Sequence, residues 1–196
     1  MSRLMIVVML LLAAREAAAQ GQPPREGSGN GHFGAPVLKV TTIRDQGAVM
    51  LGGRGGWNVS PSLVLGFGAY GTMTEVDAAP GVMPAASYAL DVKIETFGFD
   101  MEYAVRPAAP THLTLTAFVG GAANHYYKDG TNEQEGETDF MLVLEPSVGV
   151  ERRVTRWLHL NLAASYRLLG GVEQAGLQAG DLQGPSAVLA AKIGRF

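Results

Sequence analysis

The chain has 196 residues, no cysteine and a formal net charge of −3. This length suits one domain, and the lack of cysteine excludes a disulfide framework, a cysteine-based metal site and a lipid-anchored cysteine. The charge gives nucleic-acid binding no electrostatic support, and 26 glycines among many aliphatic residues argue against a disordered or strongly helical protein.

Residues 1–19 have the features of a secretory signal peptide. Arg3 provides a positive n-region, Leu4 to Ala14 an apolar h-region, and the alanines before Gln20 a small-residue cleavage site. Residues 20–34 are rich in Gly, Pro and polar side chains, with too little apolar content to offset the entropy lost on ordering. We therefore predict a signal peptide, then a flexible periplasmic lead-in over residues 20–34, then one domain over residues 35–196.

From about Ala35 onward, apolar side chains recur with a period of two, which is typical of β-strands. Several of these segments are longer than the roughly 5–6 residues usual in soluble sheets. Their number and spacing predict an all-β fold, an eight-stranded antiparallel up-and-down barrel. The predicted strands are Pro36–Ile43, Gly47–Val59, Ser62–Thr74, Tyr88–Arg106, Thr111–Tyr126, Thr138–Arg153, Trp157–Leu169 and Gly184–Phe196.

The connections between these segments alternate in length. The stretches "NVSPS", "RPAAPT" and "RVTRW" are tight, whereas "EVDAAPGVMPAAS", "KDGTNEQEGE" and "GGVEQAGLQAGDLQ" are longer. Only the first hairpin, around "RDQG", is short on the side of the long loops. Short periplasmic turns alternating with longer external loops are typical of a bacterial outer-membrane barrel, and an even strand number leaves both chain ends periplasmic.

Each segment has one apolar face and one mixed face. In "WLHLNLAASYRLL", Leu158, Leu160 and Leu162 share one face, while His159 and Asn161 share the other. The apolar faces are nearly free of charge over about 9–11 residues, the length that crosses a bilayer. A soluble lipocalin-like barrel would alternate in the same way with its leucines inside. The long strands and unequal connections favour leucines that point into lipid, which predicts a transmembrane barrel.

Aromatic residues near the strand ends support this prediction, because interfacial girdles lie there. Phe196 ends the apolar stretch "SAVLAAKIGRF", in a manner similar to the terminal aromatic residue of outer-membrane barrels. Strict alternation places Lys192 on the face of Phe196, and a lipid-facing lysine at mid-membrane would cost roughly 2–4 kcal/mol. We therefore expect Lys192 in the lumen and a bulge that turns Phe196 to the rim. The predicted interfacial aromatic residues are Trp57, Tyr103, Tyr126, Tyr166 and Phe196.

Three stretches carry a resemblance to known proteins: "GGRGGWNVSPSLVLGFGAYG", "LEPSVGVERRVTRWLHLNLAASYR" and "DLQGPSAVLAAKIGRF". Through them, Gly47 to Phe196 resembles a group of uncharacterised bacterial outer-membrane β-barrel proteins. The size and strand count are also similar to the small OmpA-type and OmpX-type barrels. The resemblance implies the fold and the location, and it implies no activity.

The predicted lumen face carries a small cluster of charges. Arg54, Asp100, Glu102 and Glu145 come from the second, fourth and sixth predicted strands at comparable depth. Unpaired charge would be costly there, so we predict that Arg54 pairs with one or more of these carboxylates. The cluster is interpreted as a polar plug that fills the lumen, with an ion path as the alternative.

The sequence favours neither catalysis nor metal binding. Some small outer-membrane barrels are lipid-modifying acyl hydrolases with a serine two residues after a histidine, and none of the four histidines here has one. His159 and Ser165 share the lumen face but lie about 20 Å apart along a strand. The acidic loop "KDGTNEQEGETD" lacks the EF-hand order of ligands. We predict no enzyme activity, no catalytic residue, no metal site and no cofactor.

The sequence thus predicts an integral outer-membrane protein with a structural or surface-interaction role. The alternatives are a small pore or ligand conduit, and a soluble exported lipocalin-like binder. The expected partners are outer-membrane lipids, lipopolysaccharide and the barrel-assembly machinery, and we expect a monomer.

Overall fold

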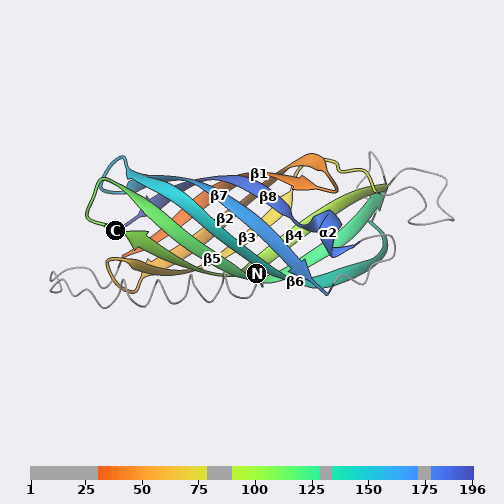
Figure 1. The fold of residues 1–196 in the computed structure, drawn as a ribbon, viewed down its shortest axis with the longest axis horizontal. Helices are drawn as coiled ribbons and strands as arrows, with labels where there is room; N and C mark the ends of the chain where they lie inside the picture. The colour runs from red at the N-terminus through yellow and green to blue at the C-terminus, as the bar shows by residue number, and fades with distance from the viewer. Residues whose placement is uncertain (1–30, 79–89, 129–133, 172–177) are drawn as a thin grey trace, which may run out of the picture.

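The computed structural model describes residues 31–78, 90–128, 134–171 and 178–196. Within these ranges the chain forms eight strands and one short helix, arranged as an elongated barrel (Figure 1). The predicted signal peptide and residues 20–30 lie outside the described residues. No helix in the described ranges is long and apolar enough to cross a bilayer. The elements are β1 (His32–Ile43), β2 (Gln46–Asn58), β3 (Leu63–Thr72), β4 (Leu90–Val105), β5 (Thr111–Lys128), β6 (Gln134–Arg153), β7 (Leu158–Gly170), α2 (Ala179–Leu182) and β8 (Gly184–Gly194).

The sheet closes on itself. Each strand pairs in antiparallel fashion with its sequence neighbour, and β1 also pairs with β8. This last seam aligns Leu38 with Leu189 and Thr41 with Ser186. Because closure removes both edges, the ladder can satisfy the backbone donors and acceptors of every strand. The predicted eight-stranded antiparallel up-and-down barrel is confirmed.

β1 begins earlier than the sequence predicted. His32 to Gly34, part of the predicted flexible lead-in, already belong to the strand. Phe33 and Ala35 are buried, and they share the inward face of β1 with Val37. Phe33 also pairs with Gly194 of β8 across the seam. The predicted boundary at residue 35 is therefore too late, because the buried Phe33 ring and the seam stabilise these residues.

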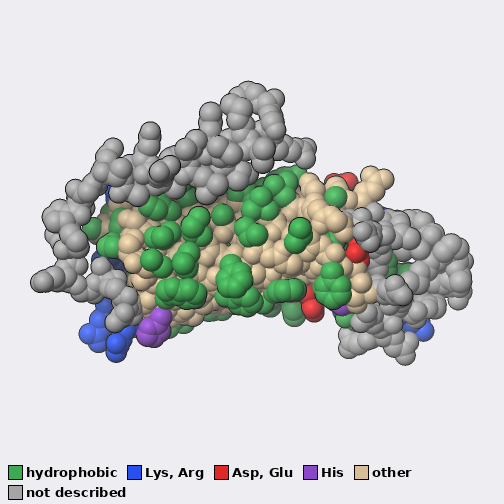
Figure 2. Space-filling model, turned by 90° about the horizontal axis from the view of Figure 1, so that it is seen from below, with side chains coloured by type: hydrophobic (Ala, Val, Ile, Leu, Met, Phe, Trp, Pro, Cys, Tyr) green, Lys and Arg blue, Asp and Glu red, His purple; other side chains and the backbone are tan. Residues whose placement is uncertain are grey.

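The predicted alternation separates an apolar outer face from a mixed inner face. On β7, Leu160 and Leu162 are exposed while His159 and Asn161 are buried. Exposed apolar side chains cover the middle of the barrel wall in Figure 2. We call the following outward residues the apolar belt: Leu38, Val40, Leu51, Phe67, Phe97, Phe99, Leu113, Val119, Phe140, Leu142, Val148, Val150, Leu160, Leu162, Leu189 and Ile193.

The two ends of the barrel differ. Residues 59–62, 106–110 and 154–157 form tight turns at the end where the C-terminus lies, which we call the short-turn end (Figure 1). The strand ends that flank the other three connections, residues 73–89, 129–133 and 171–183, lie at the opposite end, which we call the long-connection end. The predicted alternation of tight and long connections is therefore present.

The β1–β2 hairpin at the long-connection end is a two-residue turn. Arg44 and Asp45 both have positive φ, 52° and 58°, as a type I′ turn requires. The Arg44 backbone N–H donates to the Asp181 carbonyl at 2.5 Å, and Arg44 Nη1 donates to the Asp77 carbonyl at 2.6 Å. These two bonds tie the turn to α2 and to the β3–β4 connection.

An apolar cluster fills the lumen at the long-connection end. Val76 from the β3–β4 connection and Leu182 from α2 are fully buried among strand residues that point inward. Ile43, Val92 and Ile94 are fully buried in the same cluster. Apolar packing therefore lies toward this end of the barrel, with Arg167 beside it, and the other charged side chains of the lumen lie toward the short-turn end.

Candidate functional site

A group of charged side chains lies inside the barrel. Glu102 is 2% exposed and Lys192 is 1% exposed. Charged groups are rarely buried to this degree unless they are paired. We call the following residues the lumen charges: Lys39, Arg54, Asp100, Glu102, Glu145, Glu151, Arg167 and Lys192.

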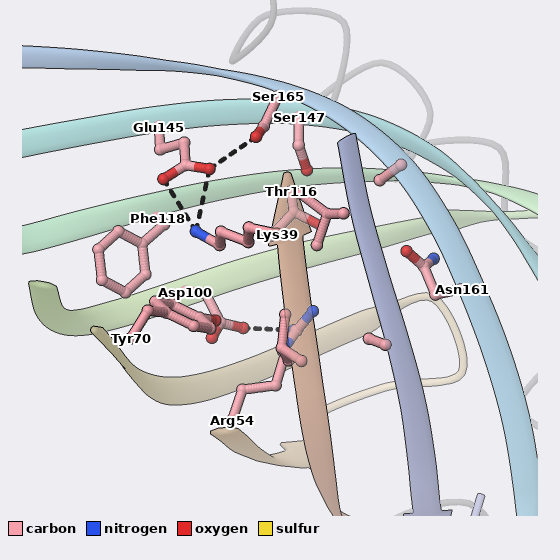
Figure 3. Close-up of a pocket in the computed structure, with 14 residues that line it drawn as sticks. Lys39, Arg54, Tyr70, Asp100, Thr116, Phe118, Glu145, Ser147, Asn161 and Ser165 are labelled. Atoms are coloured by element: carbon pink, nitrogen blue, oxygen red, sulfur yellow. Dashed lines mark hydrogen bonds and ion pairs between the residues drawn. The ribbon is translucent and has the colours of Figure 1, made fainter. Parts of the chain in front are cut away.

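The first network joins β1 to β6. Lys39 Nζ donates to both carboxylate oxygens of Glu145 at 3.0 Å. Ser165 Oγ on β7 donates to the same carboxylate at 2.6 Å (Figure 3). The Lys39 ammonium also lies 3.9 Å from the centre of the Tyr70 ring, a cation–π contact. The ion pair with Glu145 and the contact with the Tyr70 ring together offset the desolvation of the Lys39 ammonium, and the Ser165 hydroxyl stabilises the Glu145 carboxylate.

The second network begins at Arg54 on β2. Its Nη2 donates to Asp100 Oδ1 at 2.5 Å and its Nη1 donates to Glu102 Oε2 at 3.0 Å, so one guanidinium holds two carboxylates of β4. The other oxygen of Glu102 accepts a hydrogen bond from Lys192 on β8. Gly66 lies opposite Asp100 in the β3–β4 register, and a Cβ at Gly66 would lie 2.7 Å from Asp100 Oδ1. A glycine at this position therefore leaves room for the Arg54–Asp100 pair.

This second network continues to the short-turn end through β6 and β7. Lys192 also donates to Glu151. Glu151 Oε1 lies 2.8 Å from His159 Nδ1 and 3.7 Å from His112 Nε2. A chain of alternating charges and polar groups therefore runs from Arg54 to the mouth of the barrel.

Phe196 covers the mouth at the short-turn end. Its ring stacks on His159 with centroids 3.6 Å apart, and it lies 5.8 Å from the inward ring of Phe33. The β7–β8 register runs without a shift to Leu158 and Ile193, so the predicted bulge is wrong. Lys192 lies inside, as predicted, and Phe196 turns inward only after β8 has ended at Gly194.

The four lumen residues singled out from the sequence divide between the two networks. Arg54 meets Asp100 and Glu102, whereas Glu145 pairs with Lys39 instead. Sequence reasoning missed Lys39 altogether. The signal was available in β1, because Leu38 and Val40 belong to the outer face and leave Lys39 between them on the inner face.

The lumen charges balance. Lys39, Arg54, Arg167 and Lys192 face the carboxylates of Asp100, Glu102, Glu145 and Glu151. Arg167 is held mainly by carbonyl oxygens, since its Nε donates to Leu182 and its Nη2 to Thr42, at 2.8 and 3.0 Å. Four cations against four anions leave these groups with no net charge, which lowers the cost of burying them.

A small cavity separates the two networks. It measures about 40 Å³, and its lining includes Lys39 and Glu145 on one side and Arg54 and Asp100 on the other (Figure 3). A water molecule needs roughly 10–15 Å³ of such space, so the cavity accommodates a few waters and excludes larger solutes. Between its walls the lumen is filled by side chains, as is usual for eight strands.

Three of the five predicted interfacial aromatic residues point outward. Trp57 and Tyr166 are about half exposed, and Tyr103 is partly exposed. Tyr126 is only 1% exposed and packs inside the lumen with the apolar cluster. The prediction for Tyr126 was wrong because strict alternation on β5 places it on the face of Phe118. Phe196 is 43% exposed at the mouth of the lumen, where its ring stacks on His159.

The described residues contain no group of three or more His, Asp or Glu side chains placed to hold a metal ion. Residues 129–133 of the acidic loop considered in the sequence lie outside the described residues.

Comparison with known proteins identifies the fold. The Neisserial surface protein A (NspA) is similar with a TM-score of 0.59 and 15% identity, over 86% of this chain and 99% of that one. The N-terminal β-barrel domain of Pseudomonas aeruginosa OprF and the attachment invasion locus protein Ail of Yersinia pestis both give a TM-score of 0.52, at 12% and 9% identity, with the same coverage. No protein-family model and no curated protein matches the sequence. The chain therefore has the fold of the small eight-stranded outer-membrane barrels.

Proposed function

We propose that this protein is an integral protein of the bacterial outer membrane with a structural or surface-interaction role. The observation that carries the proposal is the apolar belt, in which Phe140 and Leu142 are 71% and 75% exposed. Complete burial of one such side chain is worth roughly 1.5–3 kcal/mol, so a belt of this size in water would be strongly unfavourable. Contiguous apolar patches on soluble monomers rarely exceed a few hundred Å².

The inner face supports the same proposal. A soluble lipocalin-like barrel would place its leucines inside and its charges outside. Here Lys39, Arg54 and Lys192 are inside with their carboxylate partners, and the leucines of the apolar belt are outside. This arrangement suits a wall that contacts acyl chains, with each charge paired away from the lipid.

The proposed orientation places the short turns and both chain ends in the periplasm. Outer-membrane barrels have short periplasmic turns and longer external connections. The unequal connections described above fit this arrangement, and the predicted signal peptide requires export. The long connections would then be the parts of the chain that meet surface partners.

We propose a closed lumen rather than a pore. The apolar cluster fills one end, the lumen charges other than Arg167 are paired with one another, and Phe196 lies over His159 at the other end. The cavity between the networks is far smaller than a hydrated solute path. The polar interior is therefore assigned the role of a plug, not an ion path.

We also propose that the protein is not an enzyme. Ser165, the serine that shares the inner face with His159, donates a hydrogen bond from its hydroxyl to Glu145. His159 Nδ1 is engaged with Glu151. Because neither group contacts the other, the histidine cannot serve as the base that activates the serine.

The proposed partners follow from the barrel surface. Phospholipids and lipopolysaccharide would contact the apolar belt through their acyl chains, and the barrel-assembly machinery would insert the chain. We propose a monomer, because the closed sheet leaves no edge for strand pairing with a second copy.

Gel mobility tests the membrane proposal. The protein is expressed with its signal sequence, the membrane fraction is washed with alkaline carbonate, and samples are run with and without boiling. We expect the protein to stay in the washed membranes and to run as a compact band that shifts only after boiling. Release by the wash, with no heat-dependent shift, would contradict the proposal.

A further inference from the structure

Five arginines line one arc of the short-turn end. Arg106 follows β4, Arg152 and Arg153 end β6, Arg156 lies in the β6–β7 turn and Arg195 follows β8, and all five are exposed. We call these five residues the arginine rim. In Figure 2 most of the visible Lys and Arg side chains lie at one end of the barrel, and the visible acidic side chains lie toward the other end.

The arc is continuous along one side of the barrel. Arg152 pairs with Thr111 across the β5–β6 ladder, and the Arg153 backbone N–H donates to the Pro110 carbonyl. The Gly194 N–H donates to the carbonyl of Trp157, which brings the last residues of the chain beside the β6–β7 turn. Trp157, 51% exposed, therefore lies within the arc.

Within the described residues, the arginine rim has no carboxylate partner. Arg152 Nη1 donates to the Thr111 hydroxyl at 3.1 Å, and Arg153 Nη2 donates to the Pro107 carbonyl at 3.3 Å. The tight turns at this end contain no Asp or Glu. Acidic side chains that the structure describes outside the lumen include Asp45, Glu75 and Asp77, which are exposed at the opposite end. The rim is therefore a cationic surface at one end of a chain whose net charge is −3.

The arginine rim borders the apolar belt directly. Arg152 lies opposite Leu160 in the β6–β7 register, and Val150 is the preceding outward residue on β6. Leu160 and Val150 both belong to the belt. A lipid whose acyl chain packs on the belt would therefore have its headgroup at the level of Arg152.

We propose that the arginine rim binds the phosphate groups of anionic phospholipids in the membrane leaflet at the short-turn end. This inference rests on the proposed membrane location. A guanidinium group can bind two phosphate oxygens at once through parallel hydrogen bonds. Tryptophan side chains such as Trp157 are enriched at the headgroup level of the bilayer. The position of the rim beside the belt favours a lipid over an acidic soluble protein, since a protein ligand would not need the apolar neighbour.

Lipid selectivity measured by electron paramagnetic resonance tests this inference. The barrel is reconstituted in phosphatidylcholine vesicles that contain a trace of spin-labelled phosphatidylglycerol or spin-labelled phosphatidylcholine. One basic residue near an anionic surface favours binding by about fivefold. We therefore expect phosphatidylglycerol to associate at least about fivefold more strongly than phosphatidylcholine in low salt. This preference should shrink in 0.5 M NaCl, because salt screens exposed charges.

The triple variant Arg152→Gln, Arg153→Gln, Arg156→Gln should lower the preference at least about twofold, with Arg106 and Arg195 retaining the remainder. The matched control is Lys93→Gln at the long-connection end, which should leave the preference unchanged. A wild-type protein that fails to give a heat-shifted band in neutral phosphatidylcholine vesicles would contradict the proposed membrane location. An inserted wild-type barrel without the preference, or an inserted triple variant that keeps it in full, would overturn the inference about the rim alone.

Discussion

Arg54 is the lumen residue whose loss should destabilise the barrel most clearly. Asp100 has Arg54 as its ion-pair partner, whereas Glu102 also has Lys192. The variant Arg54→Met would leave the Asp100 carboxylate buried without compensation. Removing one member of a buried pair costs about 3–5 kcal/mol. Urea unfolding in phosphatidylcholine vesicles, followed by tryptophan fluorescence, measures the change.

The control for this prediction is Arg152→Met, an exposed arginine at the rim. Exposed substitutions usually change stability by about 0.5 kcal/mol or less. If both variants unfold at the wild-type urea concentration, the Arg54 network does not stabilise the barrel.

The pairing of single residues could be predicted from the sequence only in part. Alternation is enough to place Arg54 and Glu145 inside, but it contains no information on which inward charges meet. Lys39 reaches Glu145 because the curvature of the sheet places β1 across the lumen from β6. The two residues are 106 positions apart in the sequence. The interior position of Tyr126 follows from strict alternation and was missed because its residue type suggested the interface.

The hairpin between β1 and β2 depends on its two turn residues. Asp45 is exposed and has φ 58°, a conformation that aspartate tolerates and β-branched residues do not. The variant Asp45→Val should therefore lose about 1–2 kcal/mol of stability without losing a core contact. Asp45→Gly, which relieves the same constraint, should be neutral or slightly more stable. Equal urea midpoints for the two variants would show that the turn conformation carries no energetic cost.

Elements with a clear period of two could be predicted from the sequence. All eight strands and the alternation of tight and long connections are present, because both features depend on local pattern and turn residues. The start of β1 could not be predicted locally. Phe33 is ordered by the β1–β8 seam, which joins opposite ends of the sequence. The capping of the lumen by Phe196 likewise depends on His159 from another strand.

The whole barrel should not conduct ions. Among the described residues, a cavity of about 40 Å³ lies between the two charge networks, the apolar cluster packs toward one end, and Phe196 stacks on His159 at the other. We expect no stable single-channel steps when the folded protein is added to a planar lipid bilayer. Addition of detergent alone provides the blank. Reproducible steps of constant size would contradict the closed lumen and favour the ion path.

At the scale of the whole molecule, the central claim is that the leucine-rich face contacts lipid. The natural chain has no cysteine, so a nitroxide can be attached at one introduced cysteine without competing sites. Leu162→Cys places the label on the apolar belt, and Asp45→Cys places it on the exposed hairpin turn as the control. Oxygen concentrates in acyl chains, whereas a nickel chelate stays in water, so their relaxation effects distinguish the two environments.

The most direct test is therefore the accessibility of the label at position 162 in reconstituted vesicles. We expect strong relaxation by oxygen and weak relaxation by the nickel chelate at position 162, with the chelate effect dominant at position 45. A label at position 162 that responds mainly to the chelate would mean that the leucines face water, and the membrane barrel would have to be abandoned.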